Sequence, residues 1–75
     1  MRTASLARGL GTLTAREHDV VQLIVAGKTN RQIAAQLAIS HRTVENHVAA
    51  IFGKLGVHSR LQIALKYMSL RDLLN

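Results

Sequence analysis

Apolar residues recur at helical spacing in four short segments of this chain, and each segment follows a residue that caps helices well. The residues placed to cap are Thr14, Asn30, Ser40 and Ser59. Thr14 is followed three residues later by Glu17, the spacing of a reciprocal capping box. No proline interrupts any segment. We therefore predict an all-α chain, a small four-helix domain.

The helix ends follow from the same signals. The first helix begins after Thr14 and ends at Gly27, a residue suited to the left-handed conformation at a helix end. The second helix is predicted to begin after Asn30 and to run to about residue 37, and the others are predicted over about 42–55 and 60–68. The composition of 69–75 also suits a helix. The predicted core stripe of the third helix is Val44, Val48, Ile51 and Leu55.

Composition limits what such a domain can do. Hydrophobic residues make up 48% of the chain and aromatic residues 3%, so the core must consist of small aliphatic side chains, which favours closely packed helices. A chain of 75 residues implies one domain without room for a deep catalytic cleft. We expect 1–12 to be a flexible lead-in and 13–75 to form the domain. The absence of cysteine excludes disulfides and thiolate zinc sites.

The charge balance points to an anionic partner. Ten Lys and Arg against four Asp and Glu give a net charge of +6, which attracts polyanions. Nucleic acid is the first candidate and an anionic membrane surface the second. The longest apolar run, 48–52, is far too short to span a bilayer. The first eleven residues do not resemble a signal peptide, so we expect a cytoplasmic protein.

A short helix, a three-residue break and a longer helix are typical of a helix-turn-helix, which lays its second helix in the DNA major groove. We predict that this recognition helix spans about 40–55. The face opposite its core stripe combines polar side chains with small residues that permit a close approach to the bases. The predicted base contacts, in order, are Asn46, Arg42, Glu45 and Ala49.

Phosphate contacts are expected near the starts of the second and third helices, where backbone amides and the helix dipole favour anions. The candidates there are Thr29, Asn30, Arg31, Ser40 and Thr43. Lys28, His47 and Lys54 could extend this ring of contacts. Such contacts would dominate affinity and make it fall steeply with salt.

The residues named so far resemble the C-terminal DNA-binding domain of the LuxR family, the effector domain also found in NarL/FixJ-type response regulators. The resemblance covers 13 to about 68 and rests on four blocks at the family's spacing. In one-letter code these blocks are LTARE at 13–17, GKTNRQIA at 27–34, ISHRTVENHV at 39–48 and KLGVHSR at 54–60.

The resemblance implies a four-helix transcription regulator domain that binds an inverted-repeat DNA site as a homodimer, with the fourth helix supplying the dimer contact. Leu61, Leu65 and Met68 are the candidates for that contact. Many relatives have Lys or Arg where this chain has Glu45 and Ala49, so the family's target sequences do not carry over. Relatives also carry a sensor domain in front, and the sequence leaves open a fragment or a single-domain regulator.

Other functions have less support. The chain lacks a Gly-rich phosphate loop, a nucleophile elbow and paired carboxylates, so we expect no enzyme. Its four histidines do not have metal-ligand spacing, and we expect no metal or cofactor. His41 and Glu45 are predicted to form a surface pair, and Glu17 could pair with Arg60. The main alternative is a helical module that docks a protein such as RNA polymerase.

Overall fold

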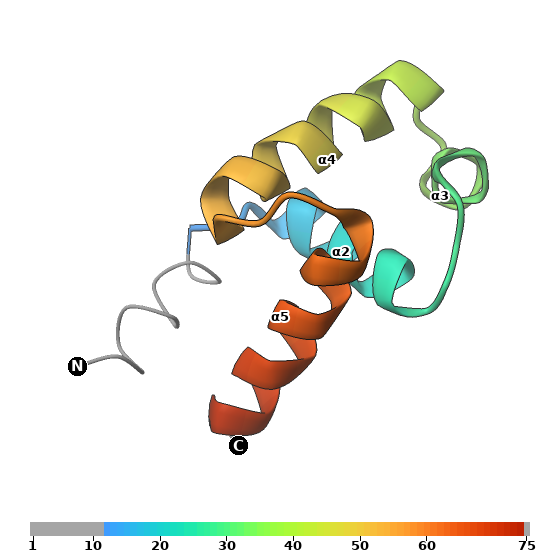
Figure 1. Cartoon of the computed structure of the whole chain (residues 1–75). Coiled ribbons are helices and arrows are strands. Elements are labelled where there is room, and N and C mark those ends of the chain that lie inside the picture. The colour runs from blue at the N-terminus through green and yellow to red at the C-terminus, as the bar shows by residue number, and fades with distance from the viewer. Residues whose placement is uncertain (1–11, 75) are drawn as a thin grey trace.

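The computed structural model describes residues 12–74 and contains four helices in this part of the chain. They are α2 (Ala15–Val25), α3 (Asn30–Leu37), α4 (His41–Leu55) and α5 (Arg60–Leu74) (Figure 1). No strand is present among these residues, so the predicted all-α fold is confirmed. Apart from Thr12, the predicted lead-in lies outside the described residues.

Capping boxes start the first two helices. Thr14 Oγ1 accepts a hydrogen bond from Glu17 N at 3.1 Å, and Thr14 N donates to Glu17 Oε1 at 2.8 Å. The prediction that Asn30 caps α3 is wrong by one residue, because Thr29 and Gln32 form a second capping box. Asn30 is instead the first residue of α3. The T-x-x-Q spacing satisfies two backbone amides at once, which a cap at Asn30 would not.

Side chains also hold both ends of α4. Ser40 caps its start as predicted, with Oγ accepting from Thr43 N at 3.0 Å. Gly56 ends the helix with a φ of 67°, a conformation that glycine adopts without steric cost. Lys66 of α5 donates to the carbonyl oxygen of Leu55 at 2.6 Å, so a carbonyl left free at the helix end gains a partner.

The core lies where α2 packs against α4 and α5, while α4 also packs against α3 and α5. All four predicted core residues of α4 are buried. The other buried aliphatic and aromatic residues are Leu13, Val20, Val21, Ile24, Ile33, Ala34, Val57, Ile63, Tyr67 and Leu70. Leu70 explains why α5 runs past the predicted end near 68, because it packs into the core beside Tyr67 and extends the buried side of the helix.

The turn between α3 and α4 contains Ala38 in the left-handed region, with φ 56° and ψ 44°. Ile39 N donates to Ala34 O at 3.0 Å across this turn, and Ile39 is partly buried against the core. Because Ala38 is left-handed, α3 ends at the residue before it and the chain turns there toward the start of α4. Figure 1 shows α4 at the edge of the fold, with α3 near its first turn.

No helix within residues 12–74 is long and apolar enough to cross a membrane.

Candidate nucleic-acid interface

The outer face of α4 carries the four predicted base-contacting residues. Arg42, Glu45, Asn46 and Ala49 are all exposed, opposite the buried stripe of the same helix. The 3.6-residue period that buries Val44 therefore leaves these four side chains in solvent. The face offers a guanidinium, a carboxylate, a carboxamide and a methyl group, which together match the kinds of groups on base edges.

Small residues on the second half of this face keep side chains from projecting far beyond the α4 backbone. A Cβ atom built at Gly53 would meet nothing within 4 Å, so the surface beside it is open. Ala49, one turn earlier, is exposed and presents only a methyl group. A rigid surface can therefore approach the α4 backbone closely along this part of the helix.

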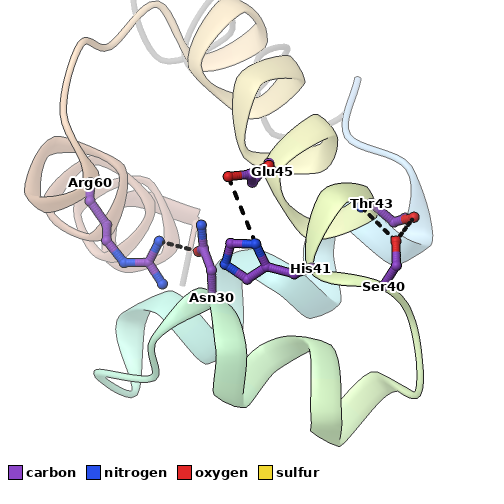
Figure 2. A network of polar contacts seen from close by, with 6 residues as sticks. All are labelled: Asn30, Ser40, His41, Thr43, Glu45 and Arg60. Carbon is purple, nitrogen blue, oxygen red and sulfur yellow. Dashed lines mark hydrogen bonds and ion pairs between the residues drawn. The ribbon is translucent and has the colours of Figure 1, made fainter.

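Glu45 has a partner within its own helix. The Nδ1 atom of His41 lies 3.8 Å from Glu45 Oε2, and both side chains are about half exposed, at 53% and 51%. The predicted surface pair is thus confirmed (Figure 2). The contact occupies one oxygen of a predicted base-contacting residue and leaves the other free to accept a hydrogen bond.

Ser40 and Thr43 form a compact polar group at the start of α4. Their hydroxyl oxygens lie 2.8 Å apart, in addition to the bond from Thr43 N to Ser40 Oγ (Figure 2). Both hydroxyls therefore serve the helix start, and each keeps further capacity as an acceptor or donor. His47 is partly buried on the same helix.

At the start of α3, Arg60 connects two of the predicted phosphate contacts to α5. Its Nη1 donates to Asn30 Oδ1 at 2.6 Å (Figure 2). Its Nη2 donates to the backbone carbonyl of Lys28 at 2.6 Å. Burial lowers the pKa of Arg60 from its usual value. Sequence reasoning missed this bridge, because it joins residues 30 or more positions apart. Thr29 and Arg31 lie exposed beside it.

Glu17 pairs with Lys54 rather than with Arg60, which corrects the pairing considered from the sequence. Lys54 Nζ donates to Glu17 Oε1 at 2.7 Å, and the Glu17 side chain is only 6% exposed. Burial alone would raise the pKa of Glu17, but the bonds from Lys54 and Thr14 outweigh it and lower that pKa. The predicted phosphate contact at Lys54 therefore has an internal anionic partner.

An apolar surface lies on α5, made of Leu61, Leu65 and Met68. These side chains are 69%, 56% and 41% exposed. They lie one helical turn apart, so they form one stripe on the outside of the helix. We call this stripe the α5 apolar face.

Among the described residues, no group of three His, Cys, Asp or Glu side chains could hold a metal ion.

Comparison with known proteins places this geometry among transcription regulators. Residues 11–67 match the family described as bacterial regulatory proteins, luxR family. The spore germination protein GerE of Bacillus subtilis (strain 168) is 41% identical over 61 residues, which are 81% of this chain and 82% of GerE.

Two further similarities involve longer proteins. A protein of Mycobacterium tuberculosis (strain ATCC 25618 / H37Rv), named as an HTH-type transcriptional regulator, is 47% identical over 57 residues. The match covers 76% of this chain but only 6% of that protein. The solved structure of the response regulator StyR superposes with a TM-score of 0.82 at 36% identity, covering 85% of this chain and 32% of StyR.

Proposed function

Because the chain belongs to the luxR family of bacterial regulatory proteins, we propose that it binds double-stranded DNA sequence-specifically, as the helix-turn-helix module of a transcription regulator. The observation that carries the proposal is the exposed face of α4, where four groups suited to base edges lie opposite a buried stripe. The net charge of +6 supports an anionic partner.

In this proposal α4 enters the major groove, which is about 12 Å wide. Asn46 bonds an adenine through its carboxamide, and Arg42 reaches a guanine or a phosphate. The free oxygen of Glu45 accepts from a cytosine amino group, and the Ala49 methyl contacts a thymine methyl. The open surface at Gly53 supports the close approach that these contacts need.

Phosphate contacts hold the module in register on the duplex but carry no sequence information. We assign them to the start of α3 and to α4, and the residues are Lys28, Thr29, Asn30, Arg31, Ser40, Thr43, His47 and Lys54. Lys54 would have to share its ammonium between Glu17 and a phosphate.

A homodimer on an inverted-repeat site would cover the α5 apolar face. Large apolar side chains that gather on an exposed helix face often mark an interaction surface. A two-fold axis through α5 would bring the same three residues of both copies together, as an isologous interface requires.

The experiment that tests the proposal is selection of bound duplexes from a random DNA pool, followed by affinity measurements on the winners and on scrambled duplexes. We expect an inverted-repeat consensus and an affinity that falls steeply with salt. Binding without any consensus would contradict sequence-specific recognition. No binding to any duplex would contradict the whole proposal and favour docking to a protein such as RNA polymerase.

Asn46→Ala tests the base-reading assignment on the selected site. We expect the variant to lose about 1–3 kcal/mol of discrimination between the consensus and a site changed at one base pair. Gln22→Ala, which removes an exposed carboxamide from α2, is the matched control and should leave that discrimination unchanged. Unchanged selectivity in Asn46→Ala would show that another residue reads that position.

A further inference from the structure

The bridge from Arg60 to the start of α3 fixes the orientation of the Asn30 side chain. A guanidinium carries only donors, so the atom of Asn30 that faces it must be the carboxamide oxygen. The distance from Arg60 Nη1 to Asn30 Oδ1 is 2.6 Å. The amide nitrogen of Asn30 therefore points away from Arg60 (Figure 2).

That nitrogen remains available to a ligand. No acceptor within residues 12–74 is hydrogen-bonded to Asn30 Nδ2, and no buried side-chain nitrogen or oxygen in this part of the chain lacks a partner. Asn30 Nδ2 must therefore be reached by solvent. It offers two N–H donors at the first residue of α3, where the helix dipole also favours an anion.

We propose that Arg60 is a positioning residue for DNA binding, which turns the Asn30 amide nitrogen outward as a donor to a backbone phosphate. The inference rests on the proposed function. Arg60 also donates to the Lys28 carbonyl at 2.6 Å. The two nitrogens of one planar guanidinium group therefore fix both the backbone before α3 and the side chain of Asn30, the first residue of α3.

The charge of Arg60 adds to this effect. Both of its bonds go to neutral oxygens, and no carboxylate of the described residues lies within ion-pair distance of its guanidinium. Its positive charge therefore stays uncompensated beside the Asn30 donors, where it would attract a phosphate. A lysine at this position would keep the charge but has no planar fork to engage both acceptors.

Asn30→Asp separates binding from stability. The aspartate would accept a stronger, charge-assisted bond from Arg60 and suits the first turn of a helix, so the urea midpoint of unfolding should stay the same or rise. The variant loses the outward donor and places a negative charge beside the phosphate. We expect its affinity for a mixed-sequence duplex to fall more than about tenfold.

Gln32→Glu is the matched control for charge. It adds one negative charge in the same turn of α3 while its carboxylate can still accept from Thr29 N in the capping box. An exposed, screened charge should lower duplex affinity by no more than about fivefold. Equal losses in Gln32→Glu and Asn30→Asp would overturn the inference, because charge alone would then explain both.

A double-mutant cycle tests whether Arg60 acts through Asn30. We expect Arg60→Lys to weaken duplex binding clearly in the wild-type background and much less in Asn30→Ala, where only the bond to the Lys28 carbonyl remains to be lost. Additive losses would overturn the positioning role. Affinities are measured by fluorescence anisotropy under conditions where circular dichroism shows every variant folded. Failure of the wild type to bind any duplex would overturn the proposed function itself, which distinguishes the two failures.

Discussion

Glu17 links the start of α2 to the end of α4. Its carboxylate accepts from Thr14 N at 2.8 Å and from Lys54 Nζ at 2.7 Å. These bonds need the ionised form, and they lower the pKa of Glu17 although burial opposes them. The proton therefore binds the unfolded chain more readily than the folded one, and acid conditions must cost stability.

The folded-state pKa of Glu17 lies below its ordinary value of 4.5. Its contribution to the free energy of unfolding is therefore fully present above that value and is lost as pH falls through the lowered pKa. We expect Glu17→Gln to show a weaker loss of stability than the wild type between about pH 5 and pH 3. Urea unfolding at several pH values measures this, and parallel pH profiles would contradict it.

Residue-level prediction from the sequence succeeded for most partners that are close along the chain, although it placed the cap of α3 at Asn30 and missed the Thr29–Gln32 capping box. The capping role of Glu17 and the His41–Glu45 pair depend on spacings of three and four residues, which helix geometry fixes. The Lys54–Glu17 bond spans 37 residues and the Arg60–Asn30 bond spans 30, so both depend on how the helices pack. No local pattern in the sequence specifies that packing.

At the scale of elements, a carbonyl group at the C-terminal end of α4 receives its hydrogen bond from a side chain of α5. The last carbonyl groups of a helix lack partners within the helix, and Lys66 supplies one to Leu55 O. A cation at this end also interacts favourably with the helix dipole. A side chain from another helix therefore stabilises the end of α4.

Lys66→Met should lower the free energy of unfolding by about 1 kcal/mol, because the Leu55 carbonyl loses its partner and the helix end loses a cation. Lys28→Met is the matched control, since it removes the same charge from an exposed side chain with no hydrogen bond from its ammonium to a described residue. Chemical unfolding measures both variants. Equal effects of the two substitutions would show that net charge alone is responsible.

The existence of all four helices followed from caps and periodicity, but the length of α5 did not. Residues 69–74 lack a distinct stop signal and have helical composition, so the sequence left their state open. Burial of Leu70, which is 2% exposed, stabilises the last turns of α5 through contacts made by other helices. Tertiary packing thus decided what local propensity could not.

At the scale of the whole molecule, the α5 apolar face should govern assembly on DNA. Leu65→Gln removes an apolar side chain that is 56% exposed, so the fold should lose little stability. We expect the variant to bind a single half-site like the wild type but to lose cooperativity on the inverted repeat. Titrations of both duplexes measure this, and full cooperativity in the variant would exclude Leu65 from the dimer contact.

The bonds that Arg60 and Lys66 of α5 make at the start of α3 and at the end of α4 also bear on how a dimer tolerates changes in its operator. A dimer joined through α5 would hold its two recognition helices at a fixed separation and angle. One base pair inserted between the half-sites rotates one of them by about 35° around the duplex axis. Because these bonds tie α5 to both helices of the helix-turn-helix, we expect the spacer length to be selected as strictly as the bases themselves.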